Sequence, residues 1–140
     1  MGKKNEKIAA LVESFRGRPD DARYLAYFAL FNQQRFFEAH EVLEELWLPE
    51  RKSLNGSFYK GLIQLAGAFV HLQKRRPQPA KSLLRLAQNN LRLYPEMHLR
   101  LSQAKTRELI DRWLEALEKS PHASHLTIEG TLPQLNLAGD

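Results

Sequence analysis

The residues best suited to chemistry lie between His40 and Trp47, in the run His-Glu-Val-Leu-Glu-Glu-Leu-Trp. Successive residues of an α-helix turn by about 100°, which places His40 and Glu44 side by side between two sets of large apolar side chains. One set is Phe37 and Leu48, and the other is Phe36, Ala39, Val42, Leu43, Leu46 and Trp47. An imidazole and a carboxylate inside an apolar arc lower stability unless each has a partner. We therefore expect the two side chains to be paired, for a structural or a functional reason.

A second polar stripe lies in the following helical segment, whose other side chains are almost all apolar or small. Residues at spacings of four, three and four form this stripe: Lys60, Gln64, Gly67 and His71. A helix that is apolar nearly all round is a central one, and antiparallel neighbours joined by a short loop pack face to face. We therefore expect Gln64 and His71 to meet the His40–Glu44 pair. Lys60 is expected to lie near Glu41 or Glu44.

The sequence can be compared with the motifs of several known kinds of catalytic site. The zinc-protease helix needs a second histidine where this chain has Glu44, and the di-iron bundles need Glu-x-x-His, which is absent. A single metal held by His40, Glu44 and His71 is geometrically conceivable. No glycine-rich phosphate loop, serine elbow or nucleotide fingerprint occurs. We predict no cofactor, and a metal-dependent or general-base enzyme using His40 and Glu44 is kept as an alternative.

A non-catalytic role accounts for the same residues. The pair and Gln64 could form a buried polar network that locks helix against helix, and Trp47 could be a core residue or an indole anchored to a carbonyl. We predict a binding or scaffold module built around this network. The candidate residues for ligand binding or for the network are His40, Glu41, Glu44, Trp47, Tyr59, Lys60, Gln64 and His71.

The chain is basic, with a formal net charge of +5. Part of this charge could form one face, made of Lys74, Arg75, Arg76, Lys81, Arg85 and Arg92. Such a face allows weak nucleic-acid binding, which is a second alternative function. No aromatic residues are interleaved with the basic ones, so nucleic acid is not the partner we expect. A small ligand, a protein partner or a second copy of the chain is expected instead, and Tyr24, Tyr27 and Phe28 are candidates for a homodimer interface.

Composition sets the cellular context that we expect. The 140 residues are 43% hydrophobic and 26% charged, which is typical of one globular domain. No cysteine is present, so disulfides and thiolate metal sites are excluded. No apolar run approaches the roughly 20 residues of a membrane span, and the N-terminal residues lack the apolar stretch of a secretory signal. We expect a cytoplasmic protein without membrane partners.

Helical periodicity extends over most of the chain and places these residues. Helices are expected near 8–15, from Asp20 or Asp21 to Phe31, over 36–48, from Asn55 or Ser57 to Gln73, over 80–94 and over 102–117. Residues from Ser120 onward lack this period and form an extended tail, held by Leu126, Ile128, Leu132 and Leu135. The fold class is therefore an all-α, single-domain bundle of about five to six helices with an extended C-terminal tail. We divide it into an N-terminal arm (1–18), a bundle (19–119) and a tail (120–140).

Two blocks of the sequence resemble a known family. The first is Phe-Phe-Glu-Ala-His-Glu-Val-Leu-Glu-Glu-Leu-Trp from Phe36 to Trp47, and the second is Phe-Tyr-Lys-Gly-Leu-Ile-Gln from Phe58 to Gln64. Both are similar to the family of domain of unknown function (DUF) 309, whose motif reads His-Glu-x-x-Glu-x-x-Trp. The resemblance spans about residues 24–94 and implies a compact helical bundle of unestablished role. Its motif positions are His40, Glu41, Glu44, Trp47, Tyr59, Gly61 and Gln64 in this chain.

Overall fold

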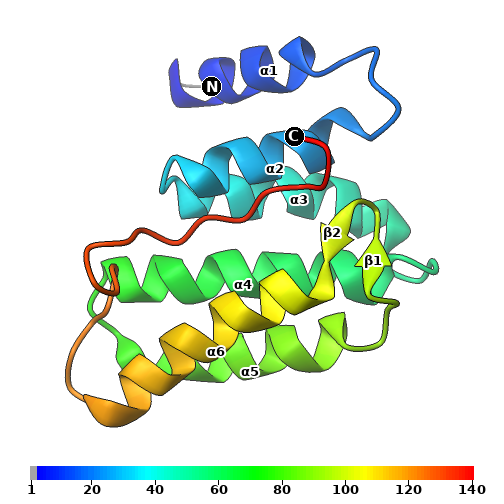
Figure 1. Cartoon of the computed structure of the whole chain (residues 1–140). Coiled ribbons are helices and arrows are strands. Elements are labelled where there is room, and N and C mark those ends of the chain that lie inside the picture. The colour runs from blue at the N-terminus through cyan, green and yellow to red at the C-terminus, as the bar shows by residue number, and fades with distance from the viewer. Residues whose placement is uncertain (1–2) are drawn as a thin grey trace.

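Helices make up most of the computed structural model, which describes residues 3–140 and the side chains from Glu6 onward. Within this range the helices are α1 (Lys3–Ser14), α2 (Ala22–Asn32), α3 (Phe36–Glu50), α4 (Gly56–Gln73), α5 (Pro77–Leu91) and α6 (Gln103–Lys119). A short antiparallel hairpin, β1 (Met97–His98) and β2 (Leu101–Ser102), precedes α6. The tail then runs back along α2 (Figure 1). The predicted all-α bundle with a C-terminal tail is confirmed.

Local chemistry explains where the helices begin and end. The side chain of Asp21, one of the two caps that the sequence allowed, accepts from the backbone N–H of Arg23 at 2.8 Å at the start of α2. Helix α5 begins at Pro77, three residues earlier than expected, because a proline in the first turn lacks only a donor that has no helical partner. Pro49 lies inside the last turn of α3. Because proline has no backbone N–H, Pro49 cannot donate to the carbonyl of Glu45 one turn earlier. That carbonyl accepts instead from the guanidinium of Arg23 at 3.4 Å.

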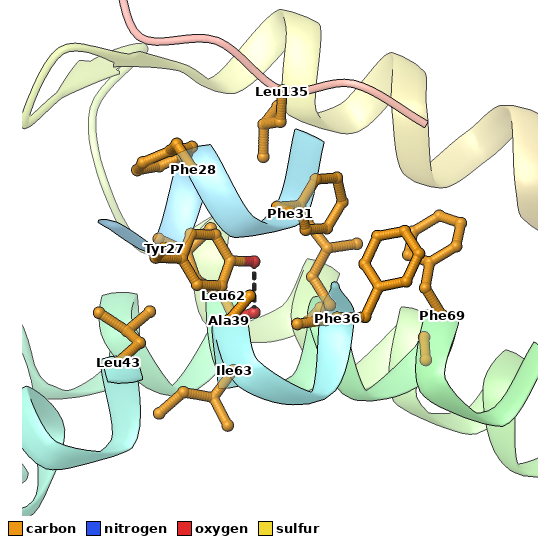
Figure 2. Packing of buried hydrophobic residues seen from close by; sticks show 14 of the residues in the cluster. Tyr27, Phe28, Phe31, Phe36, Ala39, Leu43, Leu62, Ile63, Phe69 and Leu135 are labelled. Atoms are coloured by element: carbon orange, nitrogen blue, oxygen red, sulfur yellow. Dashed lines mark hydrogen bonds between the residues drawn. The ribbon is translucent and has the colours of Figure 1, made fainter. Parts of the chain in front are cut away.

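The core is centred on α4, which packs against α2, α3 and α5. Phe69 of α4 stacks on Phe36 with ring centroids 5.0 Å apart and meets Phe31 edge-on at 5.6 Å. Near the middle of the helix, the buried hydroxyl of Tyr27 donates to the carbonyl of Leu62 at 2.7 Å (Figure 2). Burial raises the pKa of Tyr27, so the phenol stays a neutral donor. The hydrogen bond from Tyr27 to Leu62 joins α2 to α4. On the helix, Lys60 and His71 lie on the side opposite to Leu62.

Two glycines allow α5 to approach α4 closely. A Cβ added at Gly61 would lie 2.8 Å from Cγ of Leu91, closer than carbon atoms pack, and 3.2 Å from Cβ of Asn90, which is a tight contact. At Gly67 the nearest atom would be a terminal methyl carbon of Leu83, at 3.3 Å. The glycine of the motif block is therefore required by helix packing.

The hairpin and the tail differ from the sequence-based expectation. No strand was predicted at residues 97–102, where the tight turn places Leu99 and Arg100 at positive φ of 47° and 65°. The carbonyl of Leu99 accepts from the hydroxyl of Tyr24 at 2.9 Å, which fixes the turn on α2. In the tail, Leu135 is buried and Ile128 partly buried, as expected, and Leu137 is buried as well. Leu126 and Leu132 were expected to hold the tail as well, but they are 38% and 45% exposed.

The described helices include none with the length and apolarity to cross a bilayer.

Substitution of Gly61 by alanine should destabilise the fold by about 1–3 kcal/mol, because the added methyl group overpacks a contact with the buried Leu91. The matched control is Gly67→Ala, where the neighbouring atom is the end of a flexible side chain. This change should be neutral or stabilising, since alanine favours a helix over glycine by about 1 kcal/mol. Urea unfolding of both variants measures the difference. Equal free energies of unfolding for the two variants would contradict the packing argument.

Candidate functional site

The His40–Glu44 pair forms, but it lies at the surface. Nε2 of His40 is 3.4 Å from Oε2 of Glu44, and the two side chains are 29% and 45% exposed. The flanking residues Phe37 and Leu48 are 46% and 47% exposed. The expectation of a buried pair is therefore wrong. The apolar residues on one side of the pair belong to the core, whereas those on the other side are themselves open to solvent.

These four side chains share one ridge of α3, with spacings of three, four and four residues. The ring of Phe37 lies 5.8 Å from that of His40, and Leu48 follows Glu44 by one helical turn. We call Phe37, His40, Glu44 and Leu48 the α3 ridge. It presents a histidine–glutamate pair between two exposed apolar side chains.

Lys60 of α4 contacts Trp47 of α3. The ammonium Nζ lies 4.5 Å from the centroid of the indole ring, in the geometry of a cation–π interaction. Lys60 was expected to lie near Glu41 or Glu44, and the half-buried indole takes the place of those carboxylates. The contact marks the antiparallel register of the two helices. It places Glu44 about level with Gln64, and His40 about level with Gly67.

Gln64 bonds to α5 and not to the histidine–glutamate pair. Its Oε1 accepts from Nδ2 of Asn90 at 2.8 Å, beside the close approach of the helices at Gly61. The predicted contact of Gln64 with His40 and Glu44 is therefore not formed. Asn90 was not among the predicted site residues, and its only signal in the sequence is its place in the polar run Gln-Asn-Asn at 88–90.

His71 lies at the other end of the α4 stripe, near the end of the helix. Its Nδ1 is buried and has no hydrogen-bond partner among the described residues. Burial lowers the pKa of His71, and the positive charges of Arg76 and Lys74 lower it further. The imidazole is therefore neutral at pH 7, and it does not form an ion pair with the acid of α3.

Glu41 and Tyr59 lie apart from the two stripes. Glu41 lines a hollow of about 730 Å³ between α1, α2 and α3, together with Glu45, Val42, Val12 and other residues of those helices. Tyr59 is buried against Tyr24, with ring centroids 6.2 Å apart. Burial and the nearby acids Glu50 and Asp21 raise the pKa of Tyr59. Its phenol is therefore neutral at pH 7 and packs as part of the core.

The arrangement limits what the stripes can do chemically. Among the described side chains, no three or more His, Asp or Glu residues lie close enough together to hold a metal ion. The histidine–glutamate pair lies on an open helix surface, where water can reach both groups. The side chains can donate and accept hydrogen bonds, pair with charges and contact apolar groups.

Part of the basic face is neutralised within the fold. Nζ of Lys81 lies 3.7 Å from a carboxylate oxygen of Glu118, and the guanidinium of Arg85 contacts the same oxygen. The carboxylate of Glu118 in α6 therefore pairs with two of the cations that were predicted to form the basic face.

Comparisons with known proteins place the two motif blocks in a family. Residues 24–83 match the sequence profile described as "Domain of unknown function (DUF309)", so the resemblance to that family is confirmed over this range. The uncharacterized protein YpuF of Bacillus subtilis (strain 168) is 32% identical over 101 residues, which are 68% of this chain and 56% of YpuF. The chain thus spans little more than half the length of this relative. No solved structure matches significantly.

Acidification should lower the stability of the fold below about pH 6.5. Burial holds the pKa of His71 and of His98 below the ordinary value of 6.5. The unfolded chain therefore binds these protons first as the pH falls, and stability is lost from about pH 6.5 down to the lower native pKa values. Urea midpoints at pH 7.5 and pH 5.5 measure this loss.

Two variants can show how much of the stability lost on acidification is due to His71. His71→Gln should show a smaller drop between the two pH values, whereas His122→Gln, at an exposed position, should behave as the parent chain does. A drop of the same size in His71→Gln and in the parent would contradict the assignment.

Proposed function

We propose that this chain, whose residues 24–83 match the DUF309 family, is a non-catalytic protein-binding module. Its binding surface is the α3 ridge together with the α4 stripe of Lys60, Gln64, Gly67 and His71. The observation that carries the proposal is the exposure of the ridge. Two large apolar side chains, each nearly half exposed, flank the His40–Glu44 pair on one line of a helix.

The dimensions of the ridge suit a helical partner. Phe37 and Leu48 are eleven residues apart, which is about 16 Å along the axis, or three turns. Apolar side chains at the two ends can act as anchors, and charges between them can set the register of the partner. We infer that the partner presents a helix with apolar residues at a similar spacing and with polar residues between them.

Contacts within the fold hold the surface in place before binding. The indole of Trp47 holds the ammonium of Lys60, and Asn90 holds the amide of Gln64. Side chains that are ordered in the free protein lose less conformational entropy on binding.

The exposure of the pair favours binding over the enzyme alternative. General-base catalysis by Glu44, with His40 beside it, gains from a site that excludes water. The 29% and 45% exposed fractions of the two side chains provide no such exclusion. For nucleic-acid binding, the sharing of Glu118 by Lys81 and Arg85 reduces the charge that the basic face offers.

Photocrosslinking in the source cells tests the proposal. Benzoyl-phenylalanine placed at position 37 and at position 48 should crosslink to the same protein, because one partner helix spans both anchors. The charge reversal Glu44→Lys should reduce both products, since it replaces the carboxylate between the anchors with an ammonium group.

The matched control is position 132, where the native leucine is 45% exposed but lies on the tail. It should not give the product shared by positions 37 and 48. If positions 37 and 48 captured nothing beyond what position 132 captures, the ridge would not be a binding surface.

A further inference from the structure

The last residues of the tail are bound to the body as an extended peptide. Pro133, Leu135 and Leu137 are buried, whereas Gln134, Asn136 and Ala138 between them are exposed. Leu135 points toward α2, between Phe28 and Phe31 (Figure 2). This alternation is that of a strand with one buried face, although no neighbouring strand pairs with it among the described residues. We call residues 133–140 the strap.

One side chain of α2 binds both backbone groups of Leu135. The amide of Asn32 accepts from the N–H of Leu135 at 2.7 Å and donates to its carbonyl at 3.1 Å. Nε2 of Gln34 donates to the carbonyl of Pro133 at 3.1 Å. Side-chain amides thus make the hydrogen bonds that a neighbouring strand would make when a peptide adds to a sheet edge.

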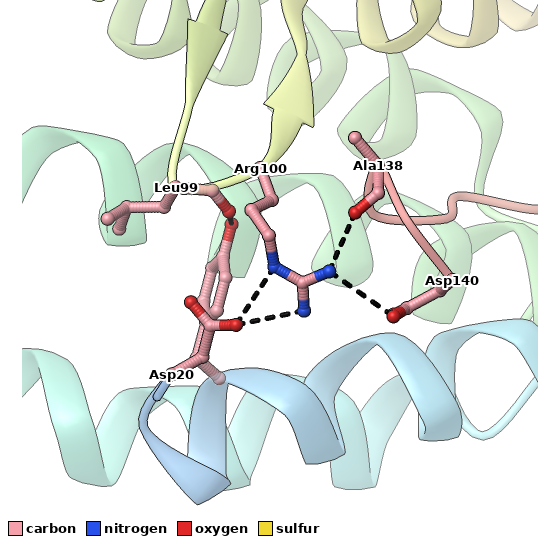
Figure 3. A network of polar contacts seen from close by, with 6 residues as sticks. Asp20, Leu99, Arg100, Ala138 and Asp140 are labelled. Atoms are coloured by element: carbon pink, nitrogen blue, oxygen red, sulfur yellow. Dashed lines mark hydrogen bonds and ion pairs between the residues drawn. The ribbon is translucent and has the colours of Figure 1, made fainter. Parts of the chain in front are cut away.

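Arg100 binds the far end of the strap in a similar way. Its carbonyl accepts from the N–H of Ala138 at 2.7 Å, and its Nη1 donates to the carbonyl of Ala138 at 2.6 Å. The same guanidinium lies 3.2 Å from Oδ1 of Asp140 and 2.8 Å from Oδ2 of Asp20 (Figure 3). Asp20 directs the guanidinium, and Asp140 supplies a charge that complements it.

The segment that connects α6 to the strap is loosely attached. Most of residues 120–132 are exposed, and they include Pro121 and Gly130. Their contacts include the indole N–H of Trp113 with the carbonyl of His125 and a bridge between Ile128 and Thr131. Thirteen steps from Ser120 to Pro133 can span up to about 43 Å when extended. The connection could therefore carry the strap away from its own body.

We propose that the surface formed by α2 and the 99–100 turn is a peptide-binding site, whose ligand is the strap, supplied by the same copy or by a second copy of the chain. The body contributes Asn32, whose side chain binds both backbone groups of Leu135, and Arg100, whose backbone carbonyl and guanidinium bind the two backbone groups of Ala138. It also contributes the sites that bury Leu135 and Leu137. A ligand from another molecule that would make all of these contacts is therefore the strap of a second copy of the chain. Exchange of straps would join two chains through contacts that already exist within one.

Binding of a separate strap to a cut chain tests the proposal. A protease site inserted between the exposed residues Glu129 and Gly130 cuts the connection and leaves every residue present. A fluorescein-labelled peptide with the sequence of residues 130–140 is then added to the cut protein. Fluorescence anisotropy should show saturable uptake as the labelled peptide replaces the cut strap. Circular dichroism of the cut protein should show unchanged helical content.

Peptide variants supply a control that leaves the protein unchanged. Leu135→Ser in the peptide removes a side chain that is 3% exposed and should weaken binding at least tenfold. Leu132→Ser removes one that is 45% exposed and should leave the affinity within about twofold. In the cut protein, Asn32→Ala should also weaken uptake at least tenfold, because both backbone groups of Leu135 lose their partner.

Three results would overturn the proposal. Loss of helical content on cutting would make the strap an inseparable part of the core. No uptake by a cut protein of native helical content would mean that the site does not accept a strap from outside. Equal binding of the Leu132→Ser and Leu135→Ser peptides would show that uptake does not use the strap site.

Discussion

The close packing of α4 with its neighbours determines most of this structure. Its apolar surface is covered by α2, α3 and α5, and a particular interaction joins it to each of these helices. Tyr27 donates to the carbonyl of Leu62 from α2, Phe69 stacks on Phe36 of α3, and Gly61 admits Leu91 of α5. What remains of α4 is a narrow stripe between α3 and α5. Polar residues occupy that stripe because it is the part of the helix that the core leaves uncovered.

This constraint divides the family motif into two physical roles. Tyr59 and Gly61 belong to packing, since one is buried among aromatic rings and the other is in contact with α5. His40, Glu44 and Gln64 lie outside the core, on the surface that α3 and α4 share. Trp47 joins the two sets, because its ring packs against the core and also holds Lys60. A motif that reads as one unit in the sequence therefore serves both the fold and a surface.

Periodicity and capping predicted the helices well, because both signals are local. Asp21, Ser102 and the end of α4 at Gln73 were placed from nearest neighbours along the chain. The burial of His40 and Glu44 was misjudged because a helical wheel shows which residues are adjacent but not where the covering helix ends. The hairpin at 97–102 depends on two residues at positive φ and on the distant Tyr24, which no local pattern reveals. Asn90 and Leu137 were missed for the same reason, since their partners lie far away in the sequence.

The central claim is that the histidine–glutamate pair of α3 belongs to a surface and contributes little to the fold. The free energies of unfolding of His40→Gln and Glu44→Gln, from urea titration at pH 7, test it most directly. The account predicts a change of less than about 0.5 kcal/mol for each variant, which is typical of an exposed pair one helical turn apart. A loss of about 3–5 kcal/mol in either variant, as expected for breaking a buried pair, would contradict it.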